Sequence, residues 1–361
     1  MLMSPLVAAL VTVATVATAT PGLDRPDAEQ VARVRAAVSE TTANEQVHPV
    51  VTRTAGADRW ETAAALSTFW TDVVWPRDDT LQRVVVVTNG EGFADSLAGG
   101  AFAGNLLGPV LLTKAAGLPS AIRAALADLQ PDRVVVVGGT VAVSETVEAQ
   151  LAGYVSDPSH VIRVDGANRY AVSAALASEL GASDVAYVAS GVEWPDGLAG
   201  GAAAGTEQAP LLLTKPDDVP SAVMTALRED VQPREIVLLG GTTGVSDAVL
   251  DELATVAPVS RVGGANRYAT AAILAERLPT YYGATVASGL EWPDALVGSA
   301  YAAVLADKVL LLKPDGVPLA SRSAVTELSL AWITALGGSL TLPEAVLDEL
   351  RAMTVDLPVN P

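Results

Sequence analysis

The sequence contains one set of four short motifs three times, always in the same order. The first motif reads TRTAGADRWETA from Thr52, IRVDGANRYAVSA from Ile162 and SRVGGANRYATA from Ser260. Its second arginine recurs at steps of 110 and 98 residues. A repeat on this scale predicts that the chain folds as three copies of one unit that pack against each other.

The other three motifs recur with nearly the same period. The second reads GEGFADSLAGG, GVEWPDGLAGG and GLEWPDALVGS, and its aspartates are Asp95, Asp196 and Asp294. The third reads PVLLTK, PLLLTK and KVLLLK, and it ends at Lys114, Lys215 and Lys313. The fourth reads VVVVGG, IVLLGG and ITALGG, and its last residues are Gly139, Gly241 and Gly338. Because the four motifs occur in the same order in every copy, they predict three units of the same fold.

Within each copy, short apolar runs alternate with helical patterns, as in RVVVV, DSLAGGAFAGNLL, PVLLT and PSAIRAALADL. Continuous β-branched runs that are separated by helices indicate buried parallel strands. We therefore expect an α/β fold in which each module has a mainly parallel sheet flanked by helices. The linkers are short, so the modules should pack as one body, in a closed pseudo-three-fold unit. The expected repeats are 50–160, 161–258 and 259–353.

The N-terminal residues have the pattern of an export signal. An apolar run ends in Ala17-Thr18-Ala19, the small-x-small pattern that signal peptidases accept, so residues 1–19 are predicted to be a signal peptide. No lysine or arginine precedes the run. The alternative is an uncleaved anchor, but Leu6 to Thr18 is shorter than the roughly 20 residues that span a bilayer. We expect a secreted protein with a linker at 20–49, a tail at 354–361 and no transmembrane span in the mature chain.

Composition excludes several classes of function. The chain has no cysteine, and its histidines are His48 and His160, which argues against disulfides, thiolate chemistry and a His-rich or Cys-rich metal site. A formal net charge of −19 argues against binding of nucleic acid. An anionic ligand would therefore need a local group of basic residues. We expect no catalytic residues, no metal and no cofactor.

The first motif predicts a tight turn followed by a helix. Its glycines would form the turn and its Asp or Asn residues would cap the helix; these residues are Gly56, Asp58, Gly166, Asn168, Gly264 and Asn266. Two arginines in each copy bracket this turn: Arg53, Arg59, Arg163, Arg169, Arg261 and Arg267. A guanidinium beside a helix N-terminus suits a phosphate or carboxylate ligand. The same arginines could instead pair with the repeated aspartates, and both interpretations stay open.

The repeated aspartates and lysines also allow two interpretations. Each aspartate opens a helix after a strand, where the helix dipole stabilises an acid, although a catalytic aspartate could occupy the same place. No histidine, cysteine or second carboxylate recurs beside all three, since Gly92 stands where later copies have Glu193 and Glu291. This favours a structural role. Three of the four lysines occupy equivalent positions, where they suit a ligand anion or an acidic neighbour. The paired glycines could also hold an anion.

In these motifs the sequence resembles the type-two cell wall binding repeat family over roughly residues 50–353. The matching strings are AGADRWETA, DGANRYAVSA and GGANRYATA, with FADSLAG, WPDGLAG and WPDALVG. The resemblance implies three Toprim-like modules in a triangular unit that holds a protein non-covalently to an anionic secondary polymer of the bacterial cell wall. The family's Ile-Leu-Leu strand motif, implicated in anchoring, falls on Val110, Leu111, Leu112, Leu211, Leu212, Leu213, Val309, Leu310 and Leu311.

The hypothesis that follows is a non-catalytic protein of the cell wall or cell surface. Its expected partner is an anionic wall polymer or a peptidoglycan-associated glycopolymer, with other surface proteins as further partners and no nucleic acid. One alternative is a self-assembling component of a surface layer. A second alternative is a wall-modifying hydrolase, which would need a zinc triad or a pair of carboxylates in a cleft.

Overall fold

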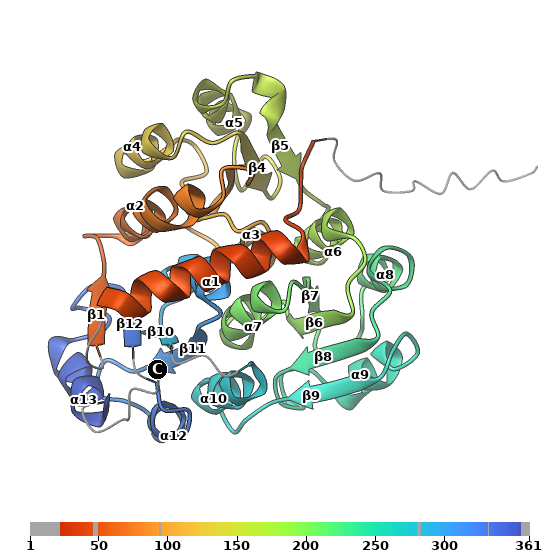
Figure 1. Ribbon diagram of the computed structural model, residues 1–361. Helices are drawn as coiled ribbons and strands as arrows, with labels where there is room; N and C mark the ends of the chain where they lie inside the picture. Colours follow the sequence, from red (N-terminus) through yellow and green to blue (C-terminus); the bar gives the residue numbers. More distant parts are fainter. Residues whose placement is uncertain (1–21, 46–49, 94, 280–282, 331, 355–361) are drawn as a thin grey trace, which may run out of the picture.

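The computed structural model describes residues 22–45, 50–93, 95–279, 283–330 and 332–354. The predicted signal peptide, and residues 355–361 of the predicted tail, lie outside these ranges. The described chain forms three four-stranded sheets with helices on both faces (Figure 1). Every pair of neighbouring strands in them is parallel, as the apolar runs predict.

The three sheets share one strand order. The first is β3-β2-β4-β5, formed by β2 (Val84–Asn89), β3 (Val110–Thr113), β4 (Arg133–Val137) and β5 (Val161–Val164). The second is β7-β6-β8-β9, formed by β6 (Val185–Ser190), β7 (Leu211–Thr214), β8 (Glu235–Leu239) and β9 (Val259–Val262). The third is β11-β10-β12-β1, formed by β1 (Val50–Thr54), β10 (Gly283–Ser288), β11 (Lys308–Leu312) and β12 (Trp332–Leu336).

Each sheet takes its last strand from the next repeat. Strand β5 begins the second repeat but completes the first sheet, and β9 does the same for the second sheet. Strand β1 belongs to the first repeat and pairs with β12 of the third, in a register that runs from Val50 opposite Trp332 to Thr54 opposite Leu336. The exchange of strands thus closes the three repeats into a ring.

Three helices of small residues form the centre of this ring. They are α3 (Ser96–Asn105), α7 (Pro195–Thr206) and α11 (Pro293–Leu305), and each contacts the other two. A Cβ added to Gly104 would lie 2.6 Å from the Cβ of Ala303 and 3.3 Å from the Cα of Gly205. The glycines near the ends of these helices are therefore suited to close packing of three helix backbones.

The remaining helices cover the outer faces of the sheets. The first repeat contributes α2 (Arg59–Phe69), α4 (Ser120–Leu129) and α5 (Glu145–Leu151). The second contributes α6 (Arg169–Leu180), α8 (Ser221–Thr225) and α9 (Asp247–Leu253), and the third α10 (Arg267–Arg277), α12 (Leu319–Glu327) and α13 (Glu344–Thr354). In the third sheet, Val286 and Leu310 face the outer layer, whereas Ala287 and Leu311 face the central core. Burial on both faces explains why the strands are continuously apolar.

The N-terminal segment contains a long helix, α1 (Ala28–Glu45), that crosses in front of the central helices in Figure 1. Its Val31, Val34 and Val38 are buried in the main core. Arg35 donates to the carbonyl oxygen of Ala303 at 2.9 Å and to that of Gly205 at 3.4 Å. These carbonyls lie at the negative C-terminal ends of central helices, so Arg35 complements their dipoles. No helix within the described ranges is long and apolar enough to span a membrane.

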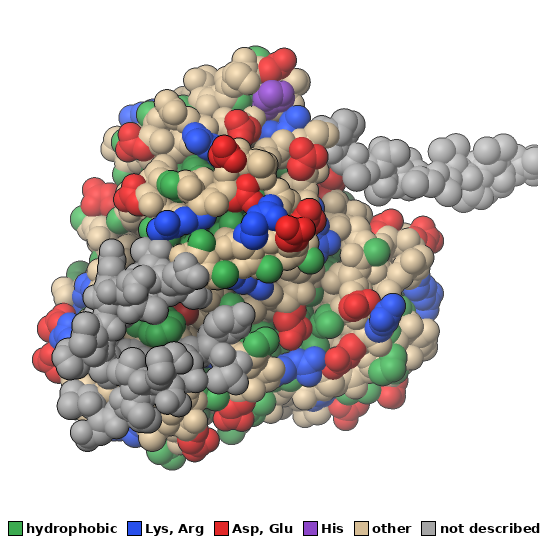
Figure 2. Space-filling view, viewed as in Figure 1, with side chains coloured by type: hydrophobic (Ala, Val, Ile, Leu, Met, Phe, Trp, Pro, Cys, Tyr) green, Lys and Arg blue, Asp and Glu red, His purple; other side chains and the backbone are tan. Residues whose placement is uncertain are grey.

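Basic and acidic side chains are interspersed over the described part of the face that carries α1 (Figure 2). In Figure 2, Lys and Arg side chains alternate with Asp and Glu side chains across this face. Much of the basic charge is paired, as in the contacts of Arg33 with Glu29 and Asp78. The candidate binding arginines lie in strands β1, β5 and β9 and at the starts of helices α2, α6 and α10, and the candidate lysines directly follow strands β3, β7 and β11.

Candidate ligand site at the repeat junctions

Three loops meet wherever one repeat adjoins the next. One is the arginine turn of a repeat, and the other two are the aspartate-bearing helix start and the glycine-pair turn of the repeat before it. We define the first junction by Asp95 and Arg169, the second junction by Asp196 and Arg267, and the closing junction by Asp294 and Arg59. In each, the arginine is close enough to act electrostatically on the aspartate.

Each repeated aspartate packs against the first glycine of the glycine pair. A Cβ on Gly138, Gly240 or Gly337 would lie 2.9, 2.7 or 2.5 Å from the Oδ2 of the aspartate in its junction. These glycines also have φ near +100°, a conformation that other residues rarely adopt. The glycine pair therefore lets the turn approach the carboxyl group.

The second arginine of each motif connects two repeats. Arg59 lies over the ring of Trp292 at 5.7 Å, Arg169 over Phe93 at 5.5 Å, and Arg267 over Trp194 at 5.1 Å. The same guanidinium groups donate to carbonyl oxygens of their own repeats, at Gly90, Gly191 and Gly289. Each arginine thus joins the aromatic residue of one repeat to the backbone of the next.

The first arginine of each motif is held beneath the glycine-pair turn. Arg53 donates to the carbonyl oxygen of Gly337 at 2.6 Å, Arg163 to that of Gly138 at 2.6 Å, and Arg261 to that of Gly240 at 3.0 Å. Each also contacts an acid on the following helix: Glu344, Glu148 or Asp247. With side chains only 12–20% exposed, these arginines present little charge to a ligand.

The repeated lysines lie exposed beside the aromatic residue that follows the second arginine. The Nζ atom of Lys114 lies 4.6 Å from the centre of the Trp60 ring, and that of Lys313 lies 5.3 Å from the centre of the Tyr268 ring. Lys215 instead forms an ion pair with Asp218 at 2.6 Å. It lines a pocket of about 710 Å³ that also includes Tyr170. The three lysines are the most accessible of the predicted binding cations.

The structural residues of the first motif begin the outer helices. Asp58, Asn168 and Asn266 cap α2, α6 and α10, and each side chain accepts from two backbone N–H groups. The preceding turn glycines, Gly56, Gly166 and Gly264, lie so close to the first helical turn that a Cβ would clash with its backbone. Around the second glycines of the pairs there is room for a Cβ: nothing lies within 4 Å at Gly139 and Gly241, and at Gly338 the nearest atom is the carbonyl oxygen of Gly56 at 3.9 Å.

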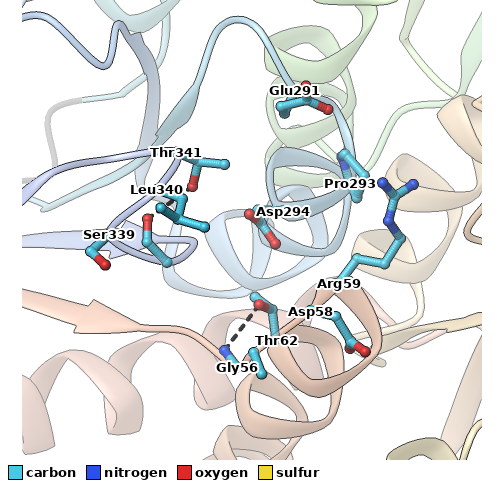
Figure 3. Close-up of a pocket in the computed structure, with 12 residues that line it drawn as sticks. Gly56, Asp58, Arg59, Thr62, Glu291, Pro293, Asp294, Ser339, Leu340 and Thr341 are labelled. Atoms are coloured by element: carbon cyan, nitrogen blue, oxygen red, sulfur yellow. Dashed lines mark hydrogen bonds between the residues drawn. The ribbon is translucent and has the colours of Figure 1, made fainter.

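The closing junction contains a pocket of about 500 Å³. Figure 3 shows Asp294 and Thr62 directed into the space between the first and third repeats, with Arg59 and Glu291 at its rim. The Oγ1 of Thr62 accepts from the backbone N–H of Gly56 at 3.1 Å. Among the pocket residues, Asp58, Glu291 and Asp294 outnumber Arg59. The pocket can accept hydrogen bonds from a ligand but is not a cationic cradle.

Burial raises the pKa of Asp95, Asp196 and Asp294. The neighbouring arginine opposes this rise in every junction, because a positive charge favours the carboxylate. The hydroxyl group of Thr270 beside Asp196 and that of Thr62 beside Asp294 also oppose it. In the described part of the chain, no group of three or more His, Asp or Glu side chains is arranged to hold a metal ion.

The residues of the implied Ile-Leu-Leu motif lie on edge strands β3, β7 and β11. All nine are buried, with at most 5% of their surface exposed. Direct contact with a polymer would therefore require rearrangement of the core, and in the present fold these residues pack the sheet against its helices.

Several contributors to the junctions were not predicted from the sequence. Thr62 and Thr270 recur at one position of the first motif, which is the signal that could have identified them. The aromatic residues two places before the aspartates, Phe93, Trp194 and Trp292, also recur. Their pairing with arginines of the next repeat depends on the exchange of strands, which repetition within one chain does not reveal.

Comparisons with known proteins agree with this architecture. The sequence profile of Cell wall binding domain 2 (CWB2) matches residues 53–148, 163–250 and 261–347. The amidase enhancer of Bacillus subtilis (strain 168) is 30% identical over 275 residues, which are 76% of this chain and 36% of the relative. The N-acetylmuramoyl-L-alanine amidase LytC of the same organism is 26% identical over 305 residues, covering 83% of this chain and 58% of LytC.

Two solved structures from Clostridium difficile have the same fold. Cwp6 superposes with a TM-score of 0.77 at 25% identity and covers 87% of this chain and 49% of Cwp6. Cwp8 superposes with a TM-score of 0.72 at 21% identity and covers 88% of this chain and 53% of Cwp8. The chain thus spans between about a third and three fifths of the length of these four proteins. With three matches over most of its length, the chain belongs to the cell wall binding domain 2 family.

Proposed function

We propose that this chain is exported and attaches non-covalently, without catalysis, to an anionic glycopolymer of the bacterial cell wall. The observation that carries the proposal is the threefold recurrence of one surface arrangement, in which an exposed lysine lies beside an aromatic residue at a junction between repeats. Contacts that recur around the ring suit a ligand that is itself a repeating polymer, because linked contacts raise the overall affinity.

The lysines are the favoured contacts for the anionic groups of the polymer. The whole chain carries a formal charge of −19, so long-range attraction cannot draw an anion to it. Lys114, Lys215 and Lys313 are exposed, whereas Arg53, Arg163 and Arg261 already bind carbonyl groups of the protein. Short-range contact with ammonium groups weakens as salt is added, so binding is expected to decrease at high ionic strength.

Sedimentation with purified cell walls tests this function. The chain from residue 20 to 361 should sediment with intact walls, and it should remain in solution after acid treatment has stripped anionic polymers from them. Changing Lys114, Lys215 and Lys313 together to alanine should reduce binding at least tenfold, because the exposed ammonium groups that face the anionic groups are lost.

Arg234→Ala provides the control for the lysine variant. Arg234 is 84% exposed and pairs only with the exposed Asp184 among the contacts described, so this change removes a surface cation away from the junctions. It should leave binding within twofold of the original. Equal binding to stripped and intact walls would contradict the anionic polymer and favour peptidoglycan itself.

A further inference from the structure

The three junctions are not chemically equivalent. The second and closing junctions share a Trp, a Glu, a Pro and a Thr around their aspartate, namely Trp194, Glu193, Pro195 and Thr270 in one and Trp292, Glu291, Pro293 and Thr62 in the other. The first junction has Phe93, Gly92 and Val172 in place of Trp, Glu and Thr. Two of the three differing positions, those of Glu291 and Thr62, line the pocket of the closing junction.

The threonine connects two elements in the second and closing junctions. Thr62 accepts from the N–H of Gly56 and lies close enough to Asp294 for its hydroxyl group to lower the pKa of that carboxyl group. Thr270 accepts from the N–H of Gly264 at 3.1 Å and acts on Asp196 in the same way. Val172 is only 1% exposed and has no hydroxyl group, so it cannot act on Asp95 in this way. Two of the three carboxyl groups therefore have a threonine hydroxyl group beside them, which the first junction lacks.

In the first junction, polar side chains instead contact the backbone of neighbouring loops. The Nδ2 of Asn89 donates to the carbonyl oxygen of Ala142 in the glycine-pair turn at 2.6 Å, where the later repeats have Ser190 and Ser288. Glu91 lies beside Ala115, with 3.4 Å between its Oε2 and the backbone nitrogen. These contacts join the loops of the junction to each other.

The lysines beside the second and closing junctions also differ from the lysine beside the first junction. Lys114 lies over Trp60, next to Arg59 of the closing junction, and Lys313 lies over Tyr268, next to Arg267 of the second. Lys215, beside the first junction, is held by Asp218. The positions equivalent to Asp218 are Gly117 and Gly316, which carry no side chain that could neutralise the lysine.

We propose that the second and closing junctions are two equivalent subsites for a neutral, hydroxyl-bearing sugar of the wall polymer, and that the first junction is structural. This inference rests on the proposed function. Each subsite offers a Glu and an Asp as hydrogen-bond acceptors, and its guanidinium already binds a carbonyl group and an aromatic ring. Sugar hydroxyls donate to such acceptors, whereas a bare anion would be repelled. The anionic groups then face Lys114 and Lys313.

Isosteric changes of exposed glutamates test the proposal. Glu193→Gln and Glu291→Gln keep the shape of the side chain but remove the charge, and Glu91→Gln is the matched change in the first junction. The probe is wall glycopolymer released from purified walls by mild acid, titrated calorimetrically into the chain. Each of the first two variants should bind about three- to tenfold more weakly, because each loses one charge-assisted hydrogen bond. The double variant should lose more, and Glu91→Gln should change binding less than twofold.

The outcomes separate this inference from the proposed function. If the unchanged chain binds neither walls nor released polymer, the proposed function fails and the inference fails with it. If it binds but both glutamine variants match it, only the division into subsites is wrong. Tighter binding by the variants would show that an anion occupies the subsites, and an equal loss for Glu91→Gln would overturn the distinction between junctions.

A second set of variants addresses the positioning threonines. Thr62→Val and Thr270→Val together should weaken binding while leaving the salt dependence unchanged, since the lysines are unaffected. Thermal unfolding of the same double variant distinguishes a loss of ligand contacts from a loss of folded protein. A fully folded double variant with unchanged affinity would contradict the role given to these residues.

Discussion

Asp307 and Lys308 form a buried pair in the third repeat, at positions where the first two repeats have Gly108-Pro109 and Ala209-Pro210. Asp307 accepts from Thr285 at 3.2 Å and from Trp332, and the ammonium group of Lys308 donates to the carbonyl oxygens of Leu278 and Pro279. Tyr301 is the other ionisable group that faces Asp307. Burial raises the pKa of Asp307 to about 7 and lowers that of Lys308 to about 8.

This pair predicts a dependence of stability on pH. The folded protein holds the Asp307 proton more tightly than the unfolded chain, in which the pKa returns to near 3.8. The free energy of unfolding should therefore fall as the pH rises from about 4 to about 7. Asp307→Asn should remove most of this fall, as measured by urea denaturation at several pH values. The exposed Asp315→Asn is the control, and an identical pH profile for the chain and Asp307→Asn would contradict the assignment.

The central helices depend on residues that are smaller than a typical helix would select. Gly104→Ala places a methyl group 2.6 Å from the Cβ of Ala303, closer than real side chains approach. We expect a loss of about 1–3 kcal/mol in stability from overpacking, despite the better helix propensity of alanine. Urea denaturation measures this loss.

Gly117→Ala is the matched control for this helix substitution. Nothing lies within 4 Å of the added Cβ, and the position has no left-handed backbone. Its stability should stay within about 0.5 kcal/mol of the original. Equal stability of Gly104→Ala and Gly117→Ala would contradict this prediction, because the central helices could then move apart without any loss in the free energy of unfolding.

Sequence patterns were most informative for individual elements and least informative for their partners. The apolar runs predict the parallel strands because burial on both faces leaves a continuous signal, as at Val84–Asn89. Nothing in Val50–Thr54 indicates that this strand pairs with β12, because pairing between distant strands depends on the path of the whole chain. Segment 20–49 was interpreted as a linker, yet it contains α1, which extends from Ala28 to Glu45 and buries three valines.

The same limit applies to the candidate site. The repeated arginines, aspartates, lysines and glycines were identified from their spacing, and the structure places representatives of each at every junction. Their neighbours come from adjacent repeats, so the spacing of the motifs could not predict the contact of Arg59 with Trp292. The Toprim-like class of the modules, which the resemblance implies, stays a prediction.

At the scale of the whole molecule, the three repeats depend on each other more than repeats in an open array do. In a linear array each repeat contacts only its neighbours, and shortening such an array is tolerated. Here α3, α7 and α11 each contact the other two, and β1 needs β12 from the other end of the ring. Loss of any repeat would expose the apolar surfaces of the two that remain.

Shortening the chain tests this dependence. A fragment of residues 22–258 keeps the first two repeats but lacks α11 and β12, so we expect it to aggregate or to unfold without a single cooperative transition. Residues 22–354 should give one cooperative transition and a monodisperse species. Size-exclusion chromatography with light scattering, followed by denaturation, measures both properties. A monomeric and cooperative two-repeat fragment would contradict the closed arrangement.

The pairing of β1 with β12 also determines how the molecule resists mechanical force. The strands are parallel, so a pull on the segment before β1 and an opposing pull on the segment after β12 would slide one strand along the other. Their five-residue register then bears the load across all its hydrogen bonds together, as in shear, rather than one bond at a time, as in unzipping. A ring closed in this way would hold its shape under tension between its two ends.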